Sequence, residues 1–105
     1  STMKRILEGT ERPQAVVAAN NLMAYGAVRA IREMRLDIPG DIAVACFDAY
    51  DPTGLVQPRI TTMIQPADSI GSKAAELIIH SSEDESIEYY NNIVLTAKLV
   101  EGDSC

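Results

Sequence analysis

The sequence predicts an α/β fold built on a parallel sheet, and the residues from Ala15 to Asp48 indicate it most clearly. Ala15–Ala19 is a short apolar run that stops at two asparagines, and Ile42–Phe47 is a second run that stops at Asp48. Between the runs, apolar side chains recur at three- and four-residue spacing, the period of a helix with one buried face. These apolar positions are Leu22, Met23, Ala27, Ala30, Ile31 and Met34.

A strand that returns through a helix to a second strand forms a βαβ unit, in which the two strands run parallel. Because helices usually cover both faces of a parallel sheet, we expect both apolar runs to be buried on both sides.

Shorter patterns define the elements around this unit. Met3–Leu7 has the apolar spacing of the last turns of an amphipathic helix. The central helix is predicted over Leu22–Leu36, and Asn20 or Asn21 is suited to cap it, because an asparagine side chain accepts from free N–H groups of a first turn. A proline–glycine pair then breaks the chain before the second strand.

The second half of the chain predicts two further strands and a further helix. A loop with two prolines and a glycine spans Asp48–Pro58, and the β-branched stretch Arg59–Ile64 is a third strand. Ala67–His80 is a helix with an apolar face, Ser81–Ser86 is a charged loop, and Ile93–Val100 is a last strand.

Composition and charge exclude several classes of function. The chain has 105 residues, enough for one modest domain, and its net charge of −6 is opposite to that of a nucleic-acid-binding surface. No apolar run approaches the ~18–20 residues of a membrane-spanning helix, and the first residues show no signal peptide. Two cysteines, Cys46 and Cys105, give no disulfide framework and fit a reducing compartment. We therefore expect a cytoplasmic protein that touches neither DNA nor a membrane through this chain.

Three polar residues stand where predicted strands end. Asn20, Asp48 and Gln65 each follow one of the first three strands. Ligands of open α/β sheets collect outside the carboxyl ends of the strands. These three residues are therefore candidates for contacting a ligand at that edge of the sheet.

Each of these residues also has a simpler interpretation. Asn20 is suited to cap a helix, Asp48 to form a turn, and Gln65 to bond the backbone beside a proline. Asp48 with Asp51 could form a metal site or an acid–base pair, but a solvated loop explains them better. His80 suits the dipole at a helix end, which explains it better than catalysis does.

Four short motifs occur in order along the chain: IPGDIAV at 38–44, FD at 47–48, P-x-I-T-T-x-x-Q-P at 58–66 and G-x-x-A-A-E-L at 71–77. In these motifs the chain resembles the effector-binding core of the LacI/GalR family of bacterial transcriptional regulators. That core shares its fold with periplasmic sugar-binding proteins. A full chain of the family carries a helix-turn-helix, a hinge helix and two α/β subdomains around an effector cleft.

The resemblance implies a Rossmann-like part of a periplasmic-binding-protein-like type I fold, without the helix-turn-helix. Residues 1–64 and 92–105 would belong to the C-terminal subdomain, and 65–91 would form a crossover and a helix of the N-terminal subdomain. Because that helix would lack most of its own lobe, we expect it to promote self-association.

Residue by residue, the resemblance implies that Asn20, Asp48 and Gln65 bind hydroxyls of the effector. Asn21 is a weaker candidate, because the family usually has aspartate at that position. These assignments favour a sugar or a related polar metabolite as the effector.

Tyr25, Leu55 and Val56 match positions that face the partner subunit in dimers of the family, which implies a homodimer. The expected function is the sensing and dimerisation core of a regulator that reaches DNA only through an N-terminal domain outside this chain. No catalytic residue, cofactor or metal site is expected, since no phosphate-binding loop, nucleophile–base set or metal-ligand spacing occurs. The alternative is a periplasmic sugar-binding protein of an ABC transporter, which shares the cleft but is exported.

Overall fold

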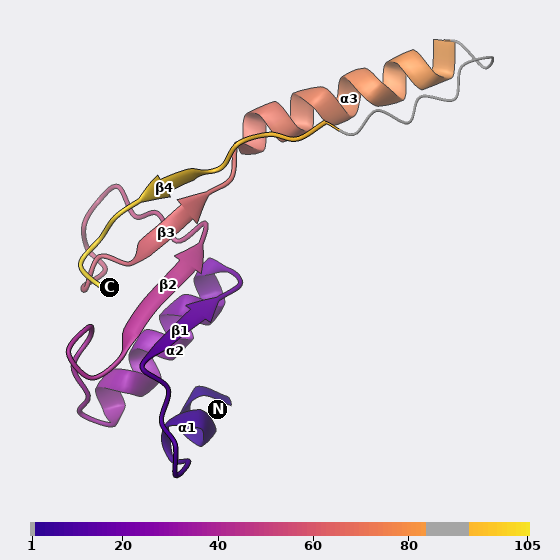
Figure 1. Cartoon of the computed structure of the whole chain (residues 1–105). Coiled ribbons are helices and arrows are strands. Elements are labelled where there is room, and N and C mark those ends of the chain that lie inside the picture. The colour runs from indigo at the N-terminus through magenta and orange to yellow at the C-terminus, as the bar shows by residue number, and fades with distance from the viewer. Residues whose placement is uncertain (1, 84–92) are drawn as a thin grey trace. The chain divides into compact units, whose positions relative to one another are not determined.

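The computed structural model describes residues 2–83 and 93–105, which form two compact units (Figure 1). Unit 1 contains Ser1–Ile64 and Leu99–Cys105, and unit 2 contains Gln65–Lys98. The assignment of these parts of the chain to two different subdomains stays a prediction.

Unit 1 is a sheet with helices packed on it. Its elements are α1 (Thr2–Leu7), β1 (Ala15–Ala18), α2 (Asn21–Glu33), β2 (Ala43–Phe47), β3 (Thr61–Ile64) and the end of β4 (Lys98–Val100). The strand order is β1-β2-β3-β4, and the first three strands run parallel. Figure 1 shows β4 running opposite to β3. The predicted βαβ unit is therefore confirmed, with an antiparallel strand added at β3.

The core of unit 1 lies between α2 and the sheet. Helix α2 contacts β1 and β2, and α1 contacts α2 in turn. The apolar face of α2 is buried against alternate residues of the strands, as the helical spacing predicts. The core consists of Met3, Leu7, Ala18, Ala24, Ala27, Val28, Ala30, Ile31, Ile42, Val44, Cys46, Ala49 and Ile60.

Two expectations about burial are wrong. Val17 in β1 is 71% exposed, and every second residue of β2 is only partly buried or exposed, because α2 covers just one face of the sheet. Leu22 and Met23 are also exposed. They lie in the first turn of α2, ahead of its first buried residue, Ala24.

The segment after β4 is fixed to the core by Ser104, whose side chain is fully buried. The Ser104 hydroxyl donates to the carbonyl oxygen of Val44 at 2.5 Å and accepts from the backbone N–H of Thr61 at 2.8 Å. Gly102 lies very close to the backbone of the loop before β3. A Cβ atom at this position would be 2.2 Å from the backbone carbonyl oxygen of Arg59. A small residue and a buried hydroxyl therefore seat this segment beside β2 and β3.

Unit 2 contains α3 (Ala67–Glu83), which begins where predicted and extends three residues past His80. The first part of the predicted charged loop is therefore helical, and residues 84–86 lie outside the described ranges. The predicted strand Ile93–Val100 is confirmed only for its last three residues. A strand needs a hydrogen-bonded neighbour, and the described part of unit 2 offers no other strand to residues 93–97.

Candidate functional site

Asn20 and Asp48 stand at equivalent positions on neighbouring strands. The parallel pairing of β1 and β2 sets Ala18 opposite Cys46, and each candidate residue follows two positions later. Both strands end at the same edge of the sheet, which we call the carboxyl edge. Neighbouring strands lie about 4.8 Å apart, so the register brings the two residues to adjacent places on this edge.

Asn20 caps helix α2. Its Oδ1 atom accepts from the backbone N–H of Met23 at 3.0 Å, and its own backbone is extended, as is typical of an N-cap. The residue is exposed, and no hydrogen bond from its Nδ2 amino group occurs within the described ranges. Capping occupies the acceptor of this amide, so its two N–H donors remain available to a ligand. The two interpretations of Asn20 are thus compatible.

Asn21, unlike Asn20, does not cap α2. Its Oδ1 atom accepts from the backbone N–H of Leu22 at 2.8 Å, which is a local contact within the first turn of α2. The residue is exposed, and its role as a weaker effector contact stays a prediction.

Asp48 is held in a left-handed backbone conformation, with φ of 59°. Aspartate adopts this conformation more readily than most residues, so the turn interpretation is correct for its backbone. The Asp48 N–H donates to the Met63 carbonyl oxygen at 2.9 Å, and the next N–H, that of Ala49, donates to the buried Thr62 hydroxyl at 3.0 Å. Both bonds fix the end of β2 against β3, while Asp48 itself is exposed at the carboxyl edge.

Gln65 directly follows β3 but belongs to unit 2. It is exposed, and its carbonyl oxygen accepts from the N–H of Ala67 at 2.8 Å at the start of α3. The structure therefore brings Asn20 and Asp48 together, and the convergence of Gln65 on them stays a prediction.

An amide donor beside an exposed carboxylate is suited to hold neighbouring hydroxyl groups of a small polar molecule, because one supplies N–H donors and the other acceptors. Asp51, the second aspartate of the metal interpretation, serves the loop instead: its carboxylate accepts from backbone and side-chain groups of Thr53 and from the Val56 N–H. In the described part of the chain, no three acidic, histidine or cysteine residues are grouped as metal ligands would be.

The predicted dimer-contact residues come together in a second feature of unit 1. Tyr25 on α2 and Leu55 and Val56 on the β2–β3 loop line one groove of about 390 Å³. Leu55 is 85% exposed, and Tyr25 packs partly against the core. The Tyr25–Leu55 groove is lined by Tyr25, Val28, Arg29, Arg32, Glu33, Leu55, Val56 and Gln57.

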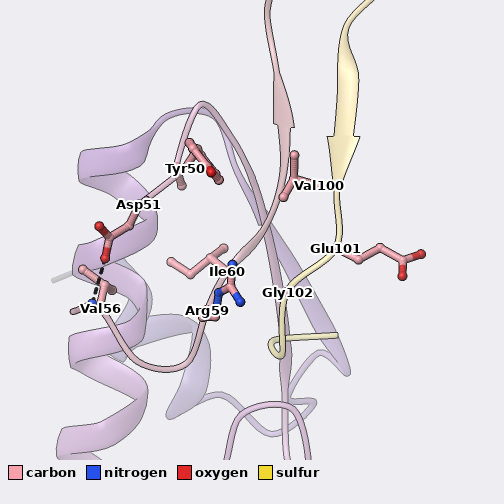
Figure 2. A pocket seen from close by; sticks show the side chains of 9 residues that line it. Tyr50, Asp51, Val56, Arg59, Ile60, Val100, Glu101 and Gly102 are labelled. Carbon is pink, nitrogen blue, oxygen red and sulfur yellow. Dashed lines mark hydrogen bonds between the residues drawn. The ribbon is translucent and has the colours of Figure 1, made fainter. Parts of the chain in front are cut away.

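A small cavity lies on the other side of the same loop (Figure 2). It has a volume of about 20 Å³, which is enough for one water molecule and far too small for a sugar. Figure 2 shows the hydrogen bond between Asp51 and Val56 that closes the loop beside this cavity. This bond was not predicted from the sequence, although an aspartate two residues before a threonine in a Pro/Gly-rich loop is a signal for such a turn.

The whole chain, residues 1–105, matches the family described as the periplasmic binding protein-like domain. The lactose operon repressor of Rhizobium radiobacter is 36% identical over 97 residues, which cover 92% of this chain and 84% of that protein. The ribose operon repressor of Escherichia coli (strain K12) is 33% identical over 102 residues, covering 97% of this chain and 31% of that protein. The chain thus spans about a third of the length of the ribose operon repressor.

Solved structures show the same relationship. The transcriptional regulator CelR in complex with cellobiose superposes with a TM-score of 0.86 at 28% identity, covering 98% of this chain and 31% of that one. A lac repressor dimer bound to operator and the anti-inducer ONPF gives a TM-score of 0.82 at 27% identity, with the same coverage of 98% and 31%.

Fold and sequence together define a periplasmic-binding-protein-like domain. Within that class, the chain belongs to the LacI/GalR family of transcriptional regulators and forms part of their effector-binding core. These relatives are transcriptional repressors and not enzymes. Within the described ranges, no helix combines the length and the apolar character needed to cross a lipid bilayer.

Proposed function

We propose that this chain is the effector-sensing and dimerisation core of a LacI-type regulator, and that its effector is a sugar or a related polar metabolite. The observation that carries the proposal is the equivalent placement of Asn20 and Asp48 at the carboxyl edge. Gln65 completes the proposed site from the start of α3, with Asn21 as a weaker contact. In this role the chain performs no catalysis and needs no cofactor.

The comparisons support the chemical class of the effector. Two similar proteins are repressors of the lactose and ribose operons, and one similar solved structure holds cellobiose. Lactose, ribose and cellobiose are polyhydroxylated molecules, and their adjacent hydroxyls can form hydrogen bonds with an amide and a carboxylate. The same relatives favour a regulator over the sugar-binding protein of a transporter, and a regulator of this class acts in the cytoplasm.

The proposed mechanism is a shift between two conformations. An effector that contacts both subdomains stabilises one relative orientation, and that bias reaches DNA through an N-terminal head. The ligand shifts the equilibrium only by its difference in affinity for the two states.

The proposed homodimer uses the Tyr25–Leu55 groove. An apolar side chain that is 85% exposed beside a half-buried tyrosine, with charged residues around them, has the composition of an interface with a polar rim. The similar lac repressor structure is a dimer, which supports this assembly.

A thermal-shift screen of the full-length protein tests the effector class. The ligands are ribose, lactose and cellobiose, with adenine and guanine as a comparison class. At a ligand concentration of about 100 times Kd, binding stabilises the folded state by ~2.7 kcal/mol, which raises Tm by several degrees. We expect at least one sugar to do so. A response to a nucleobase alone would show that the sugar class is wrong, and no response to any ligand would contradict the sensing function.

A further inference from the structure

The Tyr25–Leu55 groove depends on a loop without helix or strand. Residues 48–60 connect β2 to β3, and the tip of this loop carries both Leu55 and Val56. A flexible loop would lose entropy when a partner binds, and this loss weakens association. The loop in this structure is instead held by a network of hydrogen bonds centred on Asp51.

Both oxygens of the Asp51 carboxylate take part in this network, and Figure 2 shows the bond to Val56. Oδ1 accepts from the backbone N–H of Thr53 at 3.0 Å and also from the Thr53 hydroxyl. Oδ2 accepts from the backbone N–H of Val56 at 2.9 Å. The Thr53 hydroxyl oxygen accepts from the N–H of Leu55 at 3.2 Å. One carboxylate therefore fixes the backbone at Val56 directly and at Leu55 through Thr53.

We propose that Asp51 is the positioning residue of the dimer surface: its carboxylate holds the loop so that Leu55 and Val56 are presented to the partner subunit before association. This inference rests on the proposed use of the Tyr25–Leu55 groove as the dimer interface. Hydrogen bonds to an ionised acceptor are stronger than those between neutral groups, which suits an exposed loop. The same bonds, first from Thr53 and then from the Val56 N–H, hold the pKa of Asp51 below its ordinary value.

The test measures the dimer dissociation constant of the full-length protein by sedimentation equilibrium. We expect Asp51→Ala to raise that constant roughly tenfold. Without the carboxylate the loop must be ordered when the dimer forms, and the expected cost is similar to the loss of one charge-assisted hydrogen bond. Thr53→Val, which keeps the carboxylate but removes the hydroxyl between Asp51 and Leu55, should raise it less. Thr53→Ser restores the hydroxyl and should match the wild type.

Asp41→Ala is the matched control. Asp41 is an exposed aspartate whose carboxylate, like that of Asp51, accepts a backbone N–H (that of Asp37, at 2.7 Å), but it lies outside the groove. Asp41→Ala removes the same charge as Asp51→Ala. Because Asp41 lies outside the groove, this variant should leave the dissociation constant unchanged. Hydrogen exchange at the Leu55 and Val56 amides gives a second readout, which should accelerate in Asp51→Ala and not in Asp41→Ala.

Leu55→Lys separates this inference from the proposed function. If Leu55→Lys leaves the dimer intact, the groove is not the interface and that part of the proposed function fails. If Leu55→Lys dissociates the dimer but Asp51→Ala changes neither the dissociation constant nor the exchange rates, only the positioning role is overturned. Should Asp51→Ala fail to fold, equal dissociation constants for Thr53→Val and Thr53→Ser would overturn it.

Discussion

Asn20 and Asp48 lie two residues beyond a paired position of β1 and β2, so the register of the sheet places an amide and a carboxylate side by side at its carboxyl edge. Each residue is fixed by the backbone around it. Asn20 uses its oxygen to cap α2, and the Asp48 N–H is bonded to β3. The proposed effector site would therefore be preorganised, because its side chains start from backbone positions that the fold already holds.

The double role of Asn20 predicts that stability and binding can be separated. Asn20→Ala removes the cap and should lower the free energy of unfolding by ~1 kcal/mol. Asn20→Ser keeps a capping oxygen, so its free energy of unfolding should stay within a few tenths of a kcal/mol of the wild-type value. Because serine lacks the amide donors, this variant should bind the effector more weakly. Urea denaturation and calorimetry on the full-length protein measure the two effects. Equal loss of stability in both variants would contradict the capping role.

Ser104 should contribute more to stability than an exposed serine does. Ser104→Ala deprives the Val44 carbonyl and the Thr61 N–H of their common partner inside the fold, which costs ~1–3 kcal/mol. Ser81→Ala is the control, because the exposed Ser81 hydroxyl donates to the Ile78 carbonyl of its own helix. That change should stay within ~0.5 kcal/mol. Similar urea midpoints for both variants would show that the buried hydroxyl does not anchor the last segment.

Acid should weaken the loop network around Asp51. The pKa of Asp51 is lowered in the folded state, so the stabilisation from its ionised form is fully present above the ordinary aspartate value of about 3.9. It is lost as pH falls through the lowered pKa. Exchange of the Val56 amide should be slower in the wild type than in Asp51→Asn near pH 6, and the difference should shrink below about pH 4. A difference that persists at the lowest pH would contradict this account.

The two cysteines should differ in reactivity. Burial is the main cause that raises the pKa of the Cys46 thiol, which is only 2% exposed in β2. Cys105 is exposed. A thiol reagent at pH 8 should modify Cys105 in the native protein and Cys46 only after urea is added, as read by mass spectrometry of the two peptides. Equal rates of modification in the native state would mean that β2 opens readily.

Local patterns in the sequence predicted the elements that the structure contains. Helical spacing identified α2 and α3, apolar runs identified β1 and β2, and a β-branched stretch identified β3. The four motifs predicted the family. Errors arose where burial depends on distant partners: Val17, Leu22 and Met23 are apolar, but no described element covers them.

The candidate site was predictable in part. The rule that ligands bind at strand ends identified Asn20 and Asp48, because a strand end is a local feature of the sequence. Ser104 and the Asp51 network were not found. Ser104 acts through residues 43 and 60 positions away, and such contacts leave no periodic pattern in the chain.

Calorimetric titration of the full-length protein with the sugar that gives the largest thermal shift tests the central claim most directly. Asp48→Ala should weaken binding by roughly 10–100-fold, the loss expected for a hydrogen bond to a charged group. Asp103→Ala is the control. Asp103 is an exposed aspartate whose N–H donates to the carbonyl oxygen of Arg59, just before β3 and therefore at the end of that strand opposite to the carboxyl edge. It should bind as the wild type does. If Asp48→Ala binds the sugar as tightly as the wild type, the carboxyl edge is not the effector site.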